Sequence, residues 1–311
     1  MDGVAGIDTD AARGFLVDRR GRAVTAVELV GAGAWSRCFG FRDGADDLVI
    51  RFGRHRDDFE KDRRAAAWAS STLPIPAVLD IGPAWDGWFA VSERAFGEPL
   101  DSLDHHGWTR VLPSLLAALD AAHAVDVTAT RGFGEWRPDG GAPAATWAGH
   151  LLAVGDDRPG GRTHGWRAAL AASAIGDREV HRGIEVLERL APVLAPERRL
   201  AHADLLNGNV LADGATITAV LDWGCALYGD PLFDLAWIDV CSIWHPAIAE
   251  AAVLDSGLAH LARTGVDLTD AALRIQACQV RILVAALGYC AFVHRSDDLV
   301  AIRERLLPLI D

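Results

Sequence analysis

One short segment of the sequence brings together residue types that suit phosphoryl transfer. His202, Asp204 and Asn209 lie close together, and Asp222 follows thirteen residues after Asn209. Phosphoryl transfer needs a carboxylate that accepts or orients the proton of the attacking hydroxyl. It also needs an amide oxygen and a second carboxylate that hold the Mg²⁺ bridging the nucleotide phosphates. Hard oxygen ligands of this kind suit Mg²⁺, which takes only one or two carboxylates from a protein. We therefore predict Asp204 as the catalytic base, and Asn209 with Asp222 as the metal ligands.

The residues around these side chains predict a β-hairpin. Short apolar runs at 210–212 and 217–221 flank an Asp-Gly pair at 213–214, which is typical of a tight turn. The hairpin would present Asn209 and Asp222 at its two ends, and we expect His202 to shape the preceding loop by hydrogen bonds. The alternative is an Asx-rich turn whose side chains only cap the local backbone. The chain has only two asparagines, Asn207 and Asn209, and both lie in this loop, which favours the functional interpretation.

Length and charge limit the class of protein. The 311 residues are 50% hydrophobic and 23% charged, which fits a folded chain of about two domains or lobes and argues against disorder. Thirty Lys and Arg against 43 Asp and Glu give a net charge of −13. A surface this negative repels phosphate backbones and anionic lipid, so we expect neither a nucleic acid nor a membrane as partner. A cationic small molecule would be attracted.

Cysteine usage and the chain ends indicate the compartment. The five cysteines are far apart and form no CxxC pair, which argues against a disulfide framework or a zinc ribbon. Residues 1–22 have no apolar core of a secretory signal. The longest apolar run, 282–293, is too short to span a bilayer and predicts a buried helix. We therefore expect a cytoplasmic protein.

The elements that must position the hairpin change character along the chain. Apolar runs punctuated by glycine predict strands at 27–30, 38–42, 48–52, 78–81 and 88–93, with one Ala-rich helix over 57–71. Further on, Ala and Leu periodicity predicts helices at 109–124, 144–153, 165–190, 246–263 and 268–293. These patterns indicate an α+β protein with a small N-terminal lobe, residues 1–95, and a mainly helical C-terminal lobe, residues 96–311.

The segment that carries the predicted chemistry resembles a known family. The runs 202–211, 217–224 and 229–236 are similar to the catalytic and metal-binding segments of the aminoglycoside phosphotransferases, which have a protein-kinase-like fold. The similarity extends to 57–64, 73–82 and 132–134, where the chain most resembles the branch of the family that acts on hygromycin B. The resemblance covers most of residues 25–240. It implies a two-lobed fold with a small antiparallel β N-lobe, one main helix in that lobe, and a larger helical C-lobe.

The resemblance also implies a reaction. It points to an aminoglycoside O-phosphotransferase that uses Mg²⁺ and moves the γ-phosphoryl group of ATP or GTP to a hydroxyl of a cationic antibiotic, with hygromycin B as one candidate. A kinase for another antibiotic or for a metabolite such as choline stays open. A nucleotide-binding module without catalysis also stays open, although such a module has no physical need for Asp204, Asn209 and Asp222 together. We expect a monomer.

By the same resemblance, a glycine-rich loop covers the nucleotide phosphates. Gly31 and Gly33 would let the backbone approach the phosphates closely, and Ser36 with nearby N–H groups would donate hydrogen bonds. A β-turn that needs positive φ would explain the same glycines.

The kinase pattern also requires a cation on the third strand and an acid on the helix that holds it. The only lysine, Lys61, lies in the predicted helix, so Arg51 takes the strand position. We predict Asp62 as its partner, with Glu60 as the rival. Arginine is always charged and can bind phosphate through two donors. The alternative is that Arg51 is an exposed residue of an edge strand.

Of the remaining site predictions, the resemblance implies the hinge, and the residue types and their positions suggest the acceptor residues. Glu93 and Ala95 lie at the expected hinge, where backbone groups would bind the purine, although a plain linker predicts the same composition. Asp239 is predicted to hold an ammonium group of the acceptor, and Trp237 or Trp244 to form a wall for a sugar ring, although tryptophans at helical spacing are more often core residues.

Two further acids follow the hairpin. Asp230 resembles the buried acid of the family that braces the catalytic loop. For Asp234 we expect a structural role at the start of a helix, where a carboxylate favours the positive end of the helix dipole.

Overall fold

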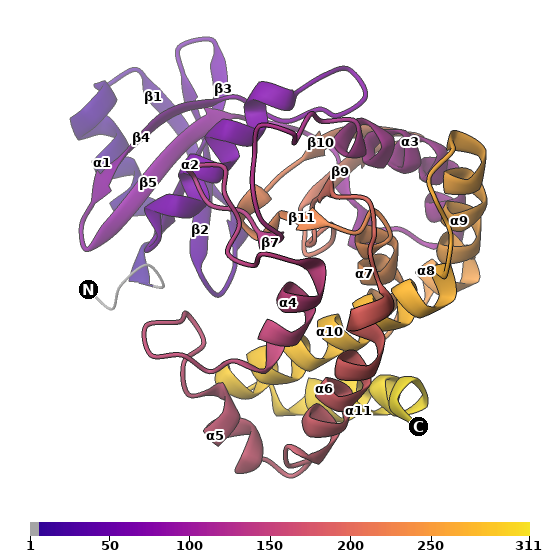
Figure 1. Ribbon diagram of the computed structural model, residues 1–311. Coiled ribbons are helices and arrows are strands. Elements are labelled where there is room, and N and C mark those ends of the chain that lie inside the picture. Colours follow the sequence, from indigo (N-terminus) through magenta and orange to yellow (C-terminus); the bar gives the residue numbers. More distant parts are fainter. Residues whose placement is uncertain (1–5) are drawn as a thin grey trace.

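The computed structural model of the protein describes residues 6–311. A five-stranded antiparallel sheet forms its N-terminal part (Figure 1). The strands lie in the order β1-β2-β3-β5-β4. Their bounds are β1 (Val24–Ala32), β2 (Ser36–Asp43), β3 (Asp46–Gly53), β4 (Val78–Ala84) and β5 (Gly87–Glu93). Arg51 pairs with Cys38 of β2 on one side and with Ala90 of β5 on the other. It therefore lies on the central strand, and the edge-strand alternative is wrong.

Two helices accompany this sheet, where the sequence predicted one. The predicted helix is α2 (Arg56–Ala65), and the second is α1 (Thr9–Arg20). Asp8 caps α1 by accepting a hydrogen bond from the N–H of Ala11 at 2.8 Å. Ala12 and Leu16, one turn apart, are buried in the sheet's apolar core. The many Asp and Arg residues of this segment hid its narrow apolar stripe. The prediction for residues 1–5 lies outside the described residues.

The predicted hairpin is confirmed. Strand β9 (Val210–Asp213) pairs antiparallel with β10 (Thr216–Val220), and Asp213 lies opposite Thr216 across a two-residue turn. Gly214 in that turn has φ +59°, a conformation that glycine adopts at little cost. The hairpin and β6 (Glu98–Pro99) form a three-stranded sheet, and β7 (Gly134–Glu135), β11 (Leu227–Gly229) and β8 (Arg199–Ala201) form a second one beside it.

The rest of the C-terminal part is helical, as predicted. The helices are α3 (His105–His123), α4 (Trp147–Leu152), α5 (Trp166–Ala171), α6 (Arg178–Leu190), α7 (Phe233–Cys241), α8 (Ala247–Glu250), α9 (Val253–Thr264), α10 (Ala271–Phe292) and α11 (Ser296–Ile310). Two predicted helices are each split in two. Gly176, with φ +67°, lies between α5 and α6, and Ala252, with φ +48°, lies between α8 and α9. A left-handed residue cannot continue a right-handed helix.

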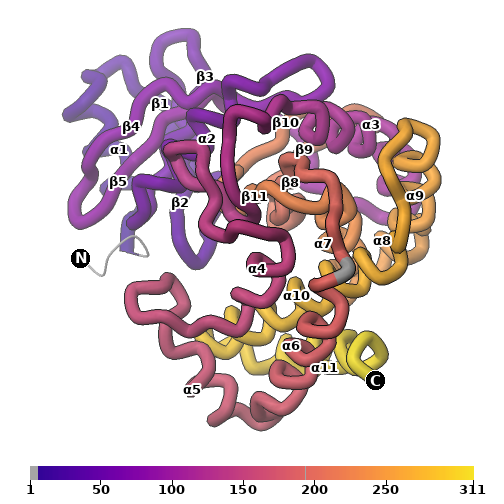
Figure 2. The backbone as a smooth tube through the Cα atoms, viewed as in Figure 1, coloured from indigo at the N-terminus to yellow at the C-terminus, as the bar shows by residue number. Residues whose placement is uncertain are grey.

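Helix α10 organises the C-terminal core. It packs against α5, α6, α7 and α11, and Figure 2 shows it running beneath α4 and α7. Among the described residues it is the one helix long and apolar enough to cross a membrane, but 67% of its most apolar window is buried inside the protein. This agrees with a core helix, which is what the apolar run predicted.

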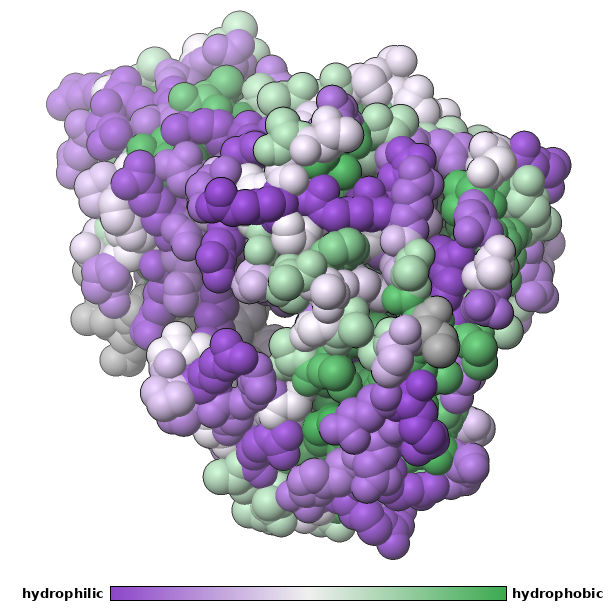
Figure 3. Space-filling model, in the orientation of Figure 1, coloured by the Kyte–Doolittle hydropathy of each residue, from purple (hydrophilic) through white to green (hydrophobic). Residues whose placement is uncertain are grey.

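Two apolar cores hold the structure together. One fills the space between α1 and the five-stranded sheet, and the other lies in the helical part. Ala65, Leu73 and Ile75 belong to the second core although they precede residue 95. The segment from the end of α2 to β4 therefore packs onto the C-terminal part. On the face shown in Figure 3, the surface is hollowed between the two parts. All five cysteines are free thiols.

Candidate active site

The loop between β8 and β9 holds the predicted base next to the predicted metal ligands. The side-chain N–H of Asn209 donates to the backbone carbonyl of Asp204 at 2.8 Å, and the N–H of Leu221 donates to the carbonyl of Asn209 at 2.7 Å. Asn207 donates to one carboxylate oxygen of Asp204, Oδ1, at 3.0 Å. Because its amide nitrogen is engaged, Asn209 keeps its side-chain oxygen for a cation.

His202 ties this loop to the end of β10. Its Nδ1 accepts from the N–H of Asp204 at 3.2 Å, so its Nε2 carries the proton that is donated to the carbonyl of Leu221 at 2.8 Å. Burial lowers the pKa of the imidazole and keeps the ring neutral. As the sequence predicted, His202 shapes the loop through hydrogen bonds.

Asp234, and not Asp230, braces the catalytic loop. The two oxygens of the fully buried Asp234 carboxylate accept from the N–H groups of His202, at 2.9 Å, and Ala203, at 2.7 Å. Asp230 instead forms a buried pair with Arg274 of α10, at 2.7 and 2.8 Å. The bracing role predicted for Asp230 is therefore wrong, whereas Asp234 does have a structural role at the start of a helix, as predicted, and also braces the loop. Asp234 lies in the first turn of α7, facing the loop, whereas Asp230 precedes the helix and faces α10.

Arg51 connects the N-terminal sheet to the predicted metal ligand. Its guanidinium pairs with Asp62 of α2 and, at 3.0 Å, with Asp222. It also lies 4.8 Å from the ring centre of Phe59. The structure brings Arg51 and Asp62 together, while Glu60 pairs with Arg56 at 2.9 Å. The strand cation and the helix acid thus meet beside the hairpin.

Burial and charge set the ionisation of these groups. Burial raises the pKa of Asp204 to about 7, with Asn207 acting against the rise and Asp222 adding to it. Burial is the largest influence on Asp222 and acts to raise its pKa, but the charge of Arg51, together with smaller contributions such as the hydrogen bond from the N–H of Gly224, holds that pKa below its ordinary value. One carboxyl is therefore poised near neutral pH, and the other stays ionised and able to bind a cation.

The glycine-rich loop, which connects β1 to β2, has open space beside Gly33. The N–H of Gly33 donates to the carbonyl of Ser36 at 2.9 Å, which closes the turn. Neither Gly31 nor Gly33 has a positive φ, and a Cβ added at Gly33 would meet nothing within 4 Å. The turn itself does not need these glycines, so the β-turn explanation is not supported. The open space is what the close approach of a ligand to the backbone requires.

The predicted hinge offers one residue with free backbone groups. The N–H of Glu93 donates to the carbonyl of Ala77, and its carboxylate accepts from the N–H of Ala77, both at 3.1 Å. Within residues 6–311, neither backbone group of Ala95 forms a hydrogen bond. Ala95 is therefore the hinge position best able to bind a base through its backbone.

The structure ties the predicted acceptor residues to the C-terminal helices. Asp239 accepts hydrogen bonds from Gln279, at 2.6 Å, and from Arg305. The indole N–H of Trp244 donates to Asp298 at 2.8 Å, and Trp237 packs against the helical core. The Asp239 carboxylate is already neutralised, so we do not include these residues in the acceptor site. The sequence contains no signal for these contacts between α7 and the last two helices, α10 and α11.

Several residues near the site were missed. Asp101, just after β6, accepts from the N–H of Gly208 at 3.2 Å, and its charge helps to raise the pKa of Asp204. Arg162, in the loop between α4 and α5, forms a two-pronged pair with Asp58 of α2, at 2.7 and 3.0 Å. Lys61 contacts the loop after Asp222. No local pattern signals these contacts, because each joins residues more than 100 positions apart.

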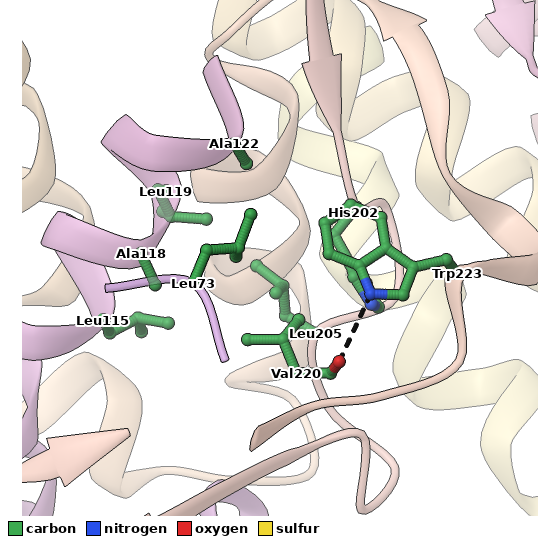
Figure 4. A pocket seen from close by; sticks show the side chains of 9 residues that line it. All are labelled: Leu73, Leu115, Ala118, Leu119, Ala122, His202, Leu205, Val220 and Trp223. Carbon is green, nitrogen blue, oxygen red and sulfur yellow. Dashed lines mark hydrogen bonds between the residues drawn. The ribbon is translucent and has the colours of Figure 1, made fainter. Parts of the chain in front are cut away.

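A small cavity lies behind the catalytic loop (Figure 4). It measures about 10 Å³ and lies between α3 and the hairpin, with His202 and Trp223 on one side and leucines and alanines of α3 on the other. A cavity needs about 10–15 Å³ and several polar partners to hold one water molecule. This one is a packing gap with a mainly apolar lining and is too small to be a substrate site.

Comparison with known proteins is consistent with this site. Residues 26–268 match the model of the phosphotransferase enzyme family. Hygromycin-B 4-O-kinase of Escherichia coli is 32% identical over 237 residues, which cover 76% of this chain and 67% of that protein. A crystal structure of a thermostable mutant of aminoglycoside phosphotransferase APH(4)-Ia, in a ternary complex with AMP-PNP and hygromycin B, is similar over 96% of this chain and 97% of that chain, with 29% identity and a TM-score of 0.82. A choline kinase from Streptococcus pneumoniae, 13% identical over 97% of this chain and 98% of that chain, has a TM-score of 0.64 and shares the fold.

Proposed function

The chain belongs to the phosphotransferase enzyme family, and we propose that it moves the γ-phosphoryl group of ATP or GTP to a hydroxyl of an aminoglycoside or aminocyclitol antibiotic. Hygromycin B is the first acceptor to test, because relatives that act on it or bind it are similar over most of this chain. The observation that carries the proposal is the hairpin site, where Asp204, Asn209 and Asp222 lie within one hydrogen-bonded unit.

The donor set fits Mg²⁺. Asn209 offers a free amide oxygen and Asp222 an ionised carboxylate, and both are hard ligands of the kind Mg²⁺ prefers. When bound there, the ion would neutralise charge that develops on the transferred group. Arg51 and the backbone around Gly31 and Gly33 would hold the phosphates of the nucleotide, with Ser36 as a further donor. Ala95, with a contribution from Glu93, would bind the base at the hinge.

Asp204 has the properties of the catalytic base. Its pKa of about 7 matches a group that must take up a proton near neutral pH. Asn207 holds Oδ1 by a hydrogen bond, which leaves Oδ2 to accept the proton of the acceptor hydroxyl. His202 and Asp234 fix the loop backbone, so the carboxylate keeps its direction during the transfer.

Charge supports a cationic acceptor. The net charge of −13 draws cations to the protein, and Asp101 adds a carboxylate close to Asp204. All five thiols are free, which supports a cytoplasmic location, and we expect the enzyme to act as a monomer.

The test is an acceptor panel with purified protein. ATP or GTP is incubated with hygromycin B, other aminoglycosides, a macrolide or choline, and nucleoside diphosphate release is measured together with the mass of the acceptor. We expect one phosphoryl group to be added to hygromycin B or a related aminocyclitol, and no transfer by Asp204→Asn. Transfer to choline alone would replace the acceptor class. Nucleotide binding without transfer to any acceptor would overturn the proposal.

A further inference from the structure

The only lysine of the chain is buried next to the predicted metal site. Lys61 of α2 is 7% exposed, and its ammonium donates to the backbone carbonyl of Gly224 at 2.6 Å. Among the described residues, no carboxylate lies within 4.0 Å of this ammonium. Burying a cation without a charged partner is unfavourable, so a residue of this kind needs a compensating role. Its single strong contact is the loop that follows Asp222.

The neighbouring residue of α2 binds the same loop. Asp62 accepts a hydrogen bond from the N–H of Trp223 at 2.7 Å, one residue before the carbonyl that Lys61 holds. Two adjacent side chains of α2 therefore fix a backbone donor and a backbone acceptor that follow the predicted metal ligand. Asp222 itself has φ +55° and ψ 73°. A residue other than glycine occupies this left-handed region at a cost, and the surrounding contacts must hold it there.

We propose that Lys61 is a positioning residue for the metal ligand Asp222. Together with Asp62 it fixes the backbone at 223–224, which holds Asp222 in its left-handed conformation and sets the direction of its carboxylate. The proposal rests on the proposed function only in assigning a metal to Asp222. Arg51 and Lys61 then have separate tasks. The guanidinium of Arg51 reaches two carboxylates at once, whereas the ammonium of Lys61 is a point donor that suits one carbonyl.

The competing explanation is that Lys61 only anchors α2 to the C-terminal part. Both explanations allow Lys61→Met to lower stability, so stability does not separate them. A positioning role predicts weaker metal binding with little change in the binding of nucleotide without metal. A general anchor predicts that both change together, or that neither does.

The experiment measures metal binding directly. Mn²⁺ is titrated into wild type, Lys61→Met and Lys61→Gln in the presence of ADP and followed by electron paramagnetic resonance, and ADP binding is measured by calorimetry in EDTA. We expect Lys61→Met to weaken Mn²⁺ binding about tenfold, a loss equivalent to about 1.4 kcal/mol. We expect Lys61→Gln, which keeps a donor, to recover part of the loss. ADP binding in EDTA should stay within about twofold of wild type.

The control is Arg63→Met, which removes a cation from the exposed face of the same helix. It should bind Mn²⁺ as wild type does. Wild-type Mn²⁺ binding by Lys61→Met, or an equal loss of ADP binding in EDTA, would overturn the inference. If Lys61→Met does not fold, Lys61→Leu, which also lacks the donor, is measured in its place, and unchanged Mn²⁺ binding by that variant with unchanged Mg²⁺ dependence of turnover would also overturn the inference. The acceptor panel tests the proposed function separately, since it can fail while the metal titration still gives these results.

Discussion

Replacing Asp204 by asparagine should make the protein more stable at neutral pH while abolishing transfer. Burial raises the pKa of this carboxyl from an ordinary value of 3.8 to about 7, so the folded protein favours its neutral form. Asparagine has nearly the same shape and carries no charge at any pH. Its side-chain oxygen can still accept the hydrogen bond that Asn207 donates at 3.0 Å. The substitution therefore removes the charge and keeps the contact.

The sign follows from proton linkage. Between about pH 4 and pH 7 the folded protein holds a proton on Asp204 that the unfolded chain has lost, so the contribution of this group to stability falls as pH rises. Each pKa unit corresponds to about 1.4 kcal/mol, so the penalty above pH 7 is at most about 4 kcal/mol. Asp204 is partly exposed, and water screens part of this penalty. We expect a gain of about 2 kcal/mol for Asp204→Asn at pH 8, and almost none at pH 4.

The assay is chemical denaturation at pH 4, 5, 6, 7 and 8 without Mg²⁺ and nucleotide, with turnover measured on the same samples. The difference in free energy of unfolding between Asp204→Asn and wild type should grow across this range. The control is Asp213→Asn, an exposed carboxylate on the turn of the same hairpin, which should leave the pH dependence unchanged. If this difference in free energy stays constant from pH 4 to pH 8, the argument that burial raises the pKa of Asp204 is refuted.

Three further substitutions test the contacts around the site. Arg51→Met leaves Asp62 and Asp222 without their cation, and calorimetry should show nucleotide binding weakened at least tenfold; unchanged binding would remove Arg51 from the phosphate site. Asp234→Asn keeps one acceptor for two buried N–H groups, so denaturation should show a loss of about 1–3 kcal/mol with a lower kcat, and normal kcat would contradict its bracing role. Arg274→Met leaves the buried carboxylate of Asp230 without its cation and should lower the free energy of unfolding by about 3–5 kcal/mol, while kcat of the protein that remains folded should stay near wild type.

The parts of the site that the sequence predicted are those set by local rules. The hairpin follows from two apolar runs and an Asp-Gly turn. Its register places Asn209 just before β9 and Asp222 just after β10, at the open end of the hairpin. Arg51 was identified because the strand position requires a cation and the chain has one lysine, which lies in the helix. Its partner Asp62 lies eleven residues away, so a short strand-to-helix connection brings the two together.

The parts that the sequence did not predict depend on contacts between distant elements. Asp230 and Asp234 lie four residues apart, and only the start of α7 at Phe233 decides which one faces the catalytic loop. Asp239 is taken up by Gln279 and Arg305, which belong to helices whose packing no local pattern specifies. The break at Ala252 has no local signal, because alanine is a strong helix former, whereas the pair Gly176-Asp177 is a turn signal that the helix prediction did not use.

Arg51 would link the proposed nucleotide site to the proposed metal site. Its guanidinium is shared between Asp62, which also holds the backbone of Trp223, and Asp222, the predicted metal ligand. A phosphate that binds Arg51 competes with Asp222 for the N–H donors of the guanidinium. A cation bound to Asp222 then neutralises the carboxylate in place of Arg51. Each ligand therefore lowers the cost of binding the other, and linkage makes the effect reciprocal. A nucleotide should tighten Mn²⁺ binding in wild type, and much less in Arg51→Met, where no guanidinium is shared.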